Sequence, residues 1–586
     1  MTTVNPASVW RSVLPFAQWL SGYSLQSLTS DCLAGITLAA YAVPVSMAYA
    51  TLAGLPPHHG IYGYLFGGAC YAVLGTSRQL AIGPTSAIAM LVGTTVAGMA
   101  EGDASRWAGI ASLTALTVGA LSILAWLLRL SGLVSFISET ILNGFKAGAA
   151  LTIAMTQLPK LFGVPGGGDH FFERVWTLAA QLGDTNVIVL GIGLGALALL
   201  LLGEKFLPNR PISLLVVALA TVVVSLTSLA ETGVATVGAL PAGLPDFTLP
   251  SMRWRDVDGI LPLNCACFLL AYIEGISAAR TLAAKNDYEI NPRQELLALG
   301  AANLAVACGQ GFPVAGGLSQ SAVNDKAGAR TPMALVVASA ALAACLLFLT
   351  ELLANLPTVV LAAIVLVAVR GLIDLQALKH LWQVSRLEFR VAMVALIGVL
   401  LLGILKGVLV ASIASLLMLL AGAARPHVAF LGRIPGTRRF SDMERHPDNE
   451  ALPDIMIFRV ESSLLYFNAQ HVRHIVWDRL QADPQLRLVV CDLSDSPVVD
   501  IAGARMLASL HMDLAKRGIQ MRVVEAHAKV RDLLRAEGLE ERIGYFGRHI
   551  SVDQAIAEFQ KAQSVTQDTN TDQHGEPGGV SPQVHA

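Results

Sequence analysis

The sequence predicts a polytopic α-helical membrane protein with 14 membrane segments, arranged as a 7+7 inverted repeat and followed by a soluble α/β domain. Three observations support this fold class. Of the 586 residues, 54% are hydrophobic and 14% are charged, whereas soluble domains carry about 25% charged residues. Two apolar segments are interrupted by glycine and proline at matching places in the two halves. From Pro453 onward, strand-like and helix-like patterns alternate as in a soluble α/β domain.

After a lead-in over residues 1–30, apolar stretches of roughly membrane length occupy residues 31–424. Their approximate limits are 32–53, 60–76, 83–99, 108–129, 133–158, 186–203, 211–229, 260–280, 295–310, 318–327, 332–350, 356–372, 388–405 and 407–423. With the N-terminus inside, the inner loops carry about thirteen Lys and Arg residues and the outer loops about six. Lys and Arg residues are enriched in the cytoplasmic loops of membrane proteins. We therefore expect a multi-pass protein of the bacterial inner membrane, in contact with the lipid bilayer and with both termini in the cytoplasm.

The tenth segment begins inside a stretch, residues 311–324, that is too short and too polar to span a bilayer. Pro313, Gly316 and Gly317 exclude a helix before Leu318. Irregular backbone at membrane depth is tolerated only where it is buried in protein or lines a cavity. A helix that begins at such a cavity presents about half a positive charge to it.

The third segment repeats this design in residues 78–87, where the break is Gly83-Pro84 and hydroxyl residues precede an apolar helix. The interrupted segments are third in each group of seven. Because seven is odd, the second half enters from the opposite side, which makes the repeat inverted. Two interrupted segments at matching places are the best sequence indication of a transporter's substrate site. We expect an anion to bind between the two helix starts.

Other chemistries are not indicated by the sequence. The seven cysteines are scattered, and Cys265 and Cys267 point to different faces of one helix, so neither a zinc site nor a disulfide framework is expected. No nucleophile–base pair, phosphate-binding loop or basic patch is present, so we expect no enzyme activity, no cofactor and no nucleic acid. A cleavable signal peptide is not evident at the N-terminus.

The remainder of the chain changes character after residue 424. Residues 425–452 are basic and are expected to form a juxtamembrane linker, 453–563 a compact α/β domain, and 564–586 a disordered tail. Strands are expected over 455–460, 464–468, 486–492 and 519–524, and helices over 470–482, 500–517, 528–536 and 551–561.

Four stretches, residues 43–62, 75–84, 274–303 and 316–332, resemble in order the sulfate permease (SulP) family of anion transporters. The soluble part resembles that family's STAS domain. The resemblance implies a fold shared with nucleobase permeases, in which a core domain holds the anion and moves like an elevator against a gate domain. It also implies a homodimer.

The resemblance further implies which residues surround the anion. These are an aromatic side chain of the first segment and the starts of the two interrupted helices: Tyr49, Thr85, Ser86, Gly317, Leu318, Ser319 and Gln320. The implied structural breaks are Pro44, Gly83, Pro84, Pro313 and Gly316. The hydroxyl residues also suit a simple capping role, which is compatible with binding because other N–H groups stay available.

Three positions depart from the family pattern. Many members have Pro-Gln where this chain has Pro44-Val45, and Ser-Arg where it has Ser319-Gln320. The missing arginine removes a fixed positive charge from the expected site. In the STAS domain, the loop that carries a phosphorylated serine in the antagonists reads Asp-Ile-Ala-Gly here, and its Ala502 has no hydroxyl to accept a phosphate.

Glu274 is the candidate for coupling transport to a proton or sodium ion. It lies about 12 residues into its segment, and therefore near the middle of the bilayer at about 1.5 Å per residue. Intramembrane carboxylates are costly and usually functional. The alternative is a carboxylate that bonds to the backbone near Gly316 and joins the two segments.

The function predicted from these features is secondary active transport of an inorganic anion, with sulfate uptake by proton- or sodium-coupled symport as the first choice. Bicarbonate and C4-dicarboxylate transport, also found in the family, are alternatives. A nucleobase carrier of the same fold and a nutrient sensor that signals through its STAS domain are two further alternatives. A cytoplasmic regulator that binds the STAS domain is a further expected partner.

Overall fold

The computed structural model describes residues 15–20, 23–100, 103–130, 139–168, 170–207, 211–227, 233–250 and 259–572. The chain divides into two compact units, Met1–Leu416 and Leu417–Ala586. Within the predicted lead-in, residues 1–14 lie outside the described residues, and so does the 573–586 part of the predicted tail.

Each of the fourteen predicted apolar segments coincides with a helix in the structure. They are α3 (Leu25–Leu52), α4 (His58–Leu74), α5 (Ser86–Ala100), α6 (Ala104–Leu127), α7 (Glu139–Phe162), α9 (Val187–Phe206), α10 (Ile212–Leu226), α12 (Leu261–Lys285), α13 (Pro292–Cys308), α14 (Leu318–Lys326), α15 (Met333–Phe348), α17 (Thr358–Arg370), α19 (Arg386–Leu402) and α20 (Ile404–Ala424). Among the described residues, five helices are long and apolar enough to cross a membrane by length and composition alone. The short helices α2 (Phe16–Leu20), α8 (Phe171–Gln181), η2 (Leu182–Asp184), α16 (Thr350–Ala354) and α18 (Leu375–Val384) lie between or before them.

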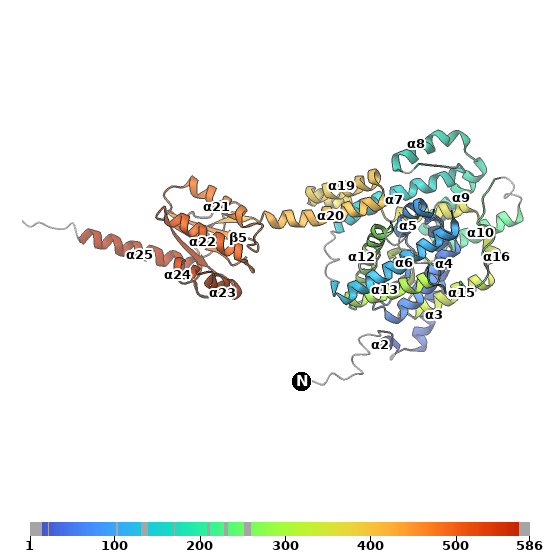
Figure 1. Cartoon of the computed structure of the whole chain (residues 1–586), viewed down its shortest axis with the longest axis horizontal. Coiled ribbons are helices and arrows are strands. Elements are labelled where there is room, and N and C mark those ends of the chain that lie inside the picture. Colours follow the sequence, from blue (N-terminus) through green and yellow to red (C-terminus); the bar gives the residue numbers. More distant parts are fainter. Residues whose placement is uncertain are drawn as a thin grey trace, which may run out of the picture. The chain divides into compact units, whose positions relative to one another are not determined.

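The membrane helices pack as two groups. The first helix group contains α3, α4, α5, α6, α12, α13, α14 and α15, and Figure 1 shows α4, α6 and α13 of this group side by side. The second helix group contains α7, α9, α10, α17 and α19, in which α7 contacts both α17 and α19. The groups meet mainly where α3 and α5 contact helices of the second group. This boundary is where the cavities described below lie.

The two interrupted segments cross each other at the centre of the first helix group. Strand β1 (Ile82–Gly83) pairs antiparallel with strand β2 (Ala315–Gly316), so that Ile82 faces Gly316 and Gly83 faces Ala315. Glycine is required on both strands, because a Cβ at Gly83 would lie 2.5 Å from the Tyr64 ring and one at Gly316 would lie 2.9 Å from the α12 backbone. The crossing therefore fixes the starts of α5 and α14 next to each other.

The predicted break at Pro44 is wrong. Helix α3 continues through Pro44 from Leu25 to Leu52. The proline removes the N–H that would bond the carbonyl of Ala40. Residues 42–50 are nevertheless all buried, and neighbouring helices in membrane proteins tolerate such an interruption of the hydrogen-bond ladder.

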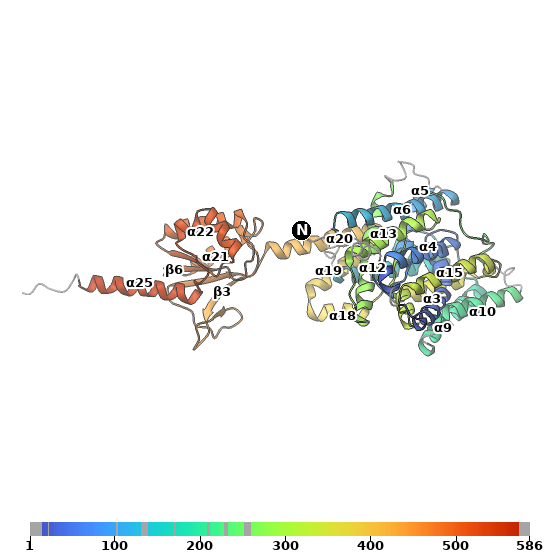
Figure 2. The same cartoon turned by 90° about the horizontal axis from the view of Figure 1, so that it is seen from below.

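The soluble unit is a five-stranded sheet in the order β4-β3-β5-β6-β7. Strands β5 (Ile455–Val460), β6 (Leu488–Asp492) and β7 (Gln520–Val524) are parallel, and β3 (Val428–Arg433) and β4 (Phe440–Asp442) add antiparallel pairs at one edge. One face packs on α21 (Ala469–Ala482), α22 (Ile501–Ala515), α23 (Ala528–Ala536) and α24 (Leu539–Ile543), and the other on α25 (Val552–Asp572). Figure 2 shows α21 and α22 opposite α25 across the sheet.

Three expectations for the soluble part are wrong. Residues 425–452 are not a linker, because β3 and β4 lie within them and β3 pairs with β5. Alternation could not reveal β3, since both of its faces are mostly buried. The tail predicted from 564 is helical through Asp572 as the continuation of α25. Residues 464–468 form no strand, only an isolated bridge between Leu464 and Val499.

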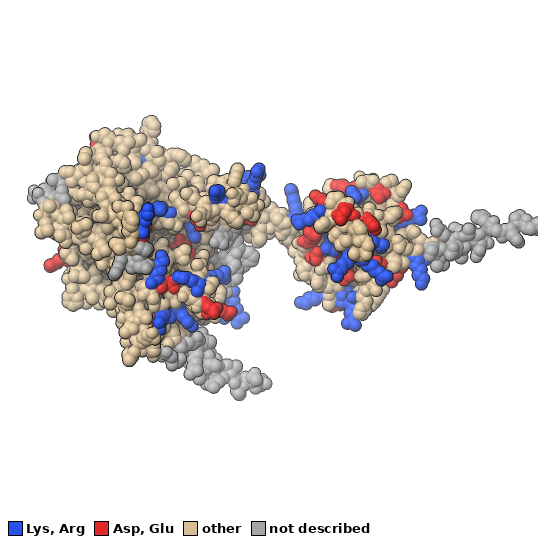
Figure 3. Space-filling model, turned by 180° about the vertical axis from the view of Figure 1, so that it is seen from behind, with Lys and Arg blue, Asp and Glu red and all other residues tan. Residues whose placement is uncertain are grey.

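Charged side chains are distributed differently on the two units. Figure 3 shows large areas of the helical unit without Lys, Arg, Asp or Glu, whereas both signs are interspersed over the soluble unit. The surface of the helical unit therefore suits contact with lipid, and the surface of the soluble unit suits contact with water.

Candidate anion site

A cavity of about 300 Å³ lies between the two helix groups, at the starts of α5 and α14. All seven predicted substrate residues and Glu274 line it: Tyr49, Thr85, Ser86, Gly317, Leu318, Ser319, Gln320 and Glu274. The structure thus brings together residues that are separated by more than 200 positions in the sequence. The role of each residue in binding is a proposal developed below.

The two helix starts supply N–H groups to this cavity. Gly317 is the N-cap of α14, with no side-chain cap, and the first intrahelical bond runs from the Ser321 N–H to the Gly317 carbonyl. The preceding N–H groups, of residues 318–320, therefore have no partner within the helix. Helix α5 begins in the same way, with the Ala89 N–H bonded to the Thr85 carbonyl.

One face of α14 holds the backbone in front of β1. The Ser321 hydroxyl accepts a hydrogen bond from the Ala81 N–H (2.8 Å), and Asn324 Nδ2 donates to the Gln79 carbonyl (3.0 Å). Gln320 Nε2 donates to the carbonyls of Ala81 (3.1 Å) and Ala315 (3.3 Å). The amide of Gln320 thus ties the crossing strands together, and little of its hydrogen-bonding capacity is left for a substrate.

Side chains from α3, α5 and α12 interact around the cavity. The Tyr49 side chain lies near Ser86, and the Glu274 carboxyl lies near the Thr85 hydroxyl. This hydroxyl is buried and makes no hydrogen bond within the described part of the chain. Glu274 is the fourteenth of the 25 residues of α12, and therefore near the middle of that helix. The next residue, Gly275, packs directly on Gly316 of β2. Movement of the crossing strands would therefore be transmitted to the backbone beside Glu274.

Lys146 was not among the site residues predicted from the sequence. This residue is on α7 of the second helix group, lines the same cavity and interacts electrostatically with Glu274. The signal was present, because a lysine within an apolar segment is rare and marks a functional site by default. Lys146 places a positive charge at the cavity from α7, whereas the helix starts belong to α5 and α14.

A second buried carboxylate belongs to Glu295 on α13, and its structural role was also not predicted from the sequence. It accepts hydrogen bonds from the Tyr71 hydroxyl (2.7 Å), the Thr76 N–H (2.8 Å), the Thr76 hydroxyl and the Ser77 N–H (3.2 Å). These donors lie at the end of α4 and in the segment that leads to β1. The network joins the two halves of the repeat beneath the crossing strands.

Among its described residues, the soluble unit holds its buried or capping carboxylates in ion pairs and helix caps. Asp492 pairs with Arg459 (2.8 Å), and Asp500 caps α22 by accepting a bond from the Gly503 N–H (2.8 Å). No three His, Cys, Asp or Glu side chains in the described part of the chain could hold a metal ion together.

Comparison with known proteins identifies the family. Residues 28–395 match the model of the sulfate permease family, which is more than half of the chain. The chain belongs to the sulfate permease family. Residues 446–555 match the model of the STAS domain. The family assignment made from the four sequence stretches is therefore confirmed, and the chain is a transporter rather than an enzyme.

Relatives and solved structures agree with this assignment. The sulfate permease chain is 34% identical over 540 residues to a probable sulfate transporter of Mycobacterium tuberculosis, covering 92% of this chain and 96% of that one. It is 30% identical to probable sulfate transporter 3.4 of Arabidopsis thaliana, covering 94% and 88% of the two chains. The fold matches murine solute carrier 26 family member A9, an anion transporter solved in the inward-facing state, with a TM-score of 0.87, 22% identity and 96% coverage of each chain. The transmembrane domain of the cyanobacterial bicarbonate transporter BicA matches with a TM-score of 0.59 and 22% identity, covering 67% of this chain and 98% of that one. The predicted fold class is confirmed, and the two interrupted helices are consistent with the 7+7 repeat.

Proposed function

We propose that this sulfate permease carries sulfate into the cell together with a proton, and that the anion binds in the cavity between the starts of α5 and α14. One observation carries the proposal: the N-termini of two helices lie at one cavity between the two helix groups, and Lys146 and Glu274 line the same cavity. The names of the sulfate transporters to which the chain is similar support the choice of anion.

The charges at the cavity match a dianion when one proton is bound. Each helix N-terminus contributes about half a positive charge, about one in total. Lys146 adds one more, and an ionised Glu274 removes one. Asp374 also lines the cavity but caps the start of α18, at the end away from the helix starts, and is left out of this local count. With Glu274 ionised the cavity carries about one positive charge, and with Glu274 protonated about two. Sulfate, with two negative charges, is therefore bound best when Glu274 holds a proton.

A proton suits this site better than a sodium ion. Sodium would have to sit beside the Lys146 ammonium, which repels any cation that arrives with its own charge. A proton on Glu274 only neutralises an existing carboxylate. In the empty protein, ionised Glu274 and Lys146 compensate each other, so the unloaded cavity also avoids an unpaired buried charge.

We propose that the first helix group carries the anion across the membrane by an elevator movement against the second helix group. In this proposal the protein is a homodimer in the bacterial inner membrane, and both termini of each chain lie in the cytoplasm. The cavity extends to Thr281 and Asp374, near the ends of α12 and α17. By the distribution of loop charges these ends face the cytoplasm. The similarity to a solved inward-facing transporter supports an inward-facing arrangement here. The STAS domain regulates or steadies the dimer through a cytoplasmic partner.

The test is uptake of labelled sulfate by the purified protein in liposomes with an imposed inward proton gradient. Wild-type protein is expected to accumulate sulfate and to accumulate more as the external pH falls. Glu274→Gln mimics the protonated carboxyl, so sulfate exchange is expected to persist while accumulation loses its dependence on pH. Glu289→Gln, which changes an exposed carboxylate, is the control and is expected to behave as wild type.

Other outcomes assign other functions. Accumulation driven by a sodium gradient would replace the proton as the coupling ion, and unchanged pH dependence in Glu274→Gln would remove the coupling role of this residue. Uptake of bicarbonate, succinate or uracil in place of sulfate would select one of the alternative substrates. Uptake that vanishes when the STAS domain is removed, with no loss of folded protein, would favour a sensor.

A further inference from the structure

A second cavity lies between the same two helix groups, beside the anion site. Its volume is about 460 Å³, against about 300 Å³ for the anion cavity. Helices α3 and α14 of the first helix group line one side of it, and α9, α10 and α17 of the second helix group line the other. Tyr41, Val45 and Ser319 line both cavities. The second cavity therefore adjoins the start of α14, where the anion is proposed to bind.

Most side chains that line the second cavity are apolar. The larger ones are Leu200, Leu207, Ile212, Val323, Ile364 and Val367. The outer surface beside the cavity is apolar too, because Ile36 on α3, Phe206 on α9 and Leu215 on α10 are all exposed. Exposed apolar surface of this kind marks contact with a membrane or a partner. The second cavity thus suits a molecule that enters from lipid rather than from water.

One buried polar group in the second cavity has an unused hydrogen. Ser213, on α10, is 8% exposed, and its hydroxyl makes no hydrogen bond within the described part of the chain. A buried hydroxyl without a partner costs free energy, so an occupant that offers an acceptor is favoured. The ester carbonyl of a glycerophospholipid is such an acceptor, and it lies between the headgroup and the acyl chains.

Two side chains of opposite charge also line the second cavity. Glu204 lies near the end of α9, and Lys326 is the last residue of α14. Both are exposed. The carboxylate next to Lys326 in the sequence, Asp325, is paired with Lys285 (2.6 Å). In the proposed orientation these helix ends lie at the cytoplasmic face, at the depth of lipid headgroups. A zwitterionic headgroup, with one ammonium and one phosphate, is complementary to this pair of charges.

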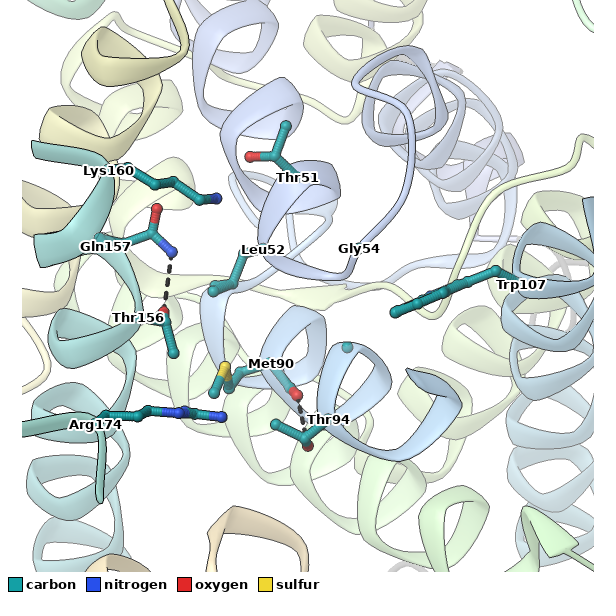
Figure 4. Close-up of a pocket in the computed structure, with 11 residues that line it drawn as sticks. Thr51, Leu52, Gly54, Met90, Thr94, Trp107, Thr156, Gln157, Lys160 and Arg174 are labelled. Atoms are coloured by element: carbon teal, nitrogen blue, oxygen red, sulfur yellow. Dashed lines mark hydrogen bonds between the residues drawn. The ribbon is translucent and has the colours of Figure 1, made fainter. Parts of the chain in front are cut away.

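A third cavity differs from the second in the character of its wall. It has a volume of about 440 Å³ and lies at the end of α7 that carries Lys160, as Figure 4 shows. Its polar and cationic lining residues are Thr51, Thr94, Thr156, Gln157, Lys160 and Arg174. The apolar wall and the pair of opposite charges therefore select the second cavity, and not the third, for an amphiphile.

We propose that the second cavity binds one phospholipid with an ammonium headgroup. The lipid ammonium lies at Glu204, its phosphate at Lys326, and an ester carbonyl accepts a hydrogen bond from Ser213, while an acyl chain follows the apolar wall. Both helix groups contribute to this wall, so the bound lipid stabilises their present arrangement over any other. When the first helix group moves, Lys326 moves relative to Glu204, and the lipid therefore slows transport. This consequence, unlike the binding itself, rests on the proposed function.

The test of binding is the thermal unfolding midpoint of the full-length protein in detergent, titrated with phosphatidylethanolamine. A ligand at about ten times its Kd is expected to raise the midpoint of a protein of this size by about 2 °C. Phosphatidylglycerol with the same acyl chains lacks the ammonium and is expected to give less than half of this shift. Glu204→Gln and Lys326→Gln are each expected to lose most of the phosphatidylethanolamine shift. Glu289→Gln and Lys379→Gln change exposed charges that line neither cavity, and they are the matched controls.

The outcomes separate this inference from the proposed function. Equal shifts with both lipids, or a full shift in both cavity variants, would refute the lipid site, and so would the absence of any shift in the wild-type protein. In liposomes with a rising fraction of phosphatidylethanolamine, the initial rate of sulfate uptake is expected to fall for the wild type and to fall less for Lys326→Gln. Equal dependence of the two proteins on this lipid would refute its effect on transport. Wild-type liposomes without sulfate uptake would refute the proposed function, whereas the unfolding midpoints would still decide on the lipid site.

Discussion

Removing the charge of Lys146 is the sharpest test of the anion site, because Lys146 is the one Lys or Arg among the described residues that line the cavity. In Lys146→Gln the cavity keeps the two helix N-termini but loses a full positive charge. A hydrogen bond to a charged group contributes about 1.5–3 kcal/mol. At about 1.4 kcal/mol for each factor of ten, KM for sulfate is expected to rise about ten- to hundredfold, measured as initial uptake into liposomes at fixed pH.

Companion variants decide whether charge is the cause. Lys146→Arg keeps the charge and is expected to stay within a few-fold of wild type. Adding Gln320→Arg to Lys146→Gln supplies a positive charge from α14 and is expected to recover at least part of the lost affinity. Adding Glu274→Gln removes the carboxylate that Lys146 no longer neutralises, so it should also lower KM relative to Lys146→Gln alone. Such non-additivity is the signature of groups that interact.

Two results would refute the reasoning. One is a KM in Lys146→Gln within twofold of wild type, which would show that the ammonium does not act on the anion. The other is additive effects of the Lys146 and Glu274 changes, which would show that the two charges act independently. Lys379→Gln, at an exposed position outside the cavity, is the control for a general effect of net charge.

Two further predictions concern stability and domain limits. Glu295→Gln removes the ionised acceptor from all four donors and leaves at least one of them facing the amide nitrogen, which cannot accept. The change should destabilise the helical unit by about 2–4 kcal/mol. A lower thermal unfolding midpoint in detergent than that of Glu289→Gln would show it, and equal midpoints would contradict it. A chain that ends at residue 424 should remain monodisperse and transport sulfate. A chain that ends at residue 440 should aggregate, because it keeps strand β3 without its partner β5. Equal behaviour of the two chains in size-exclusion chromatography would refute the assignment of β3 to the STAS sheet.

The anion site shows how far sequence reasoning reached. The positions of Gly83, Pro84, Pro313 and Gly316 predicted where helices stop, because glycine and proline act through the local backbone. The structure places these breaks in one antiparallel crossing, and residues from both segments line one cavity. The role of Gln320 was less predictable. Its amide bonds the carbonyls of Ala81 and Ala315, contacts that depend on a strand more than 200 residues away.

By itself, the sequence determined the membrane character, the segment limits, the interrupted helices and the STAS domain, since each follows from local composition, periodicity or backbone restriction. Only the tertiary structure decided that α3 runs unbroken through Pro44, that β3 completes the STAS sheet, and that Lys146 faces Glu274. Those features depend on packing between distant segments, which supplies the burial and charge partners that no local pattern contains.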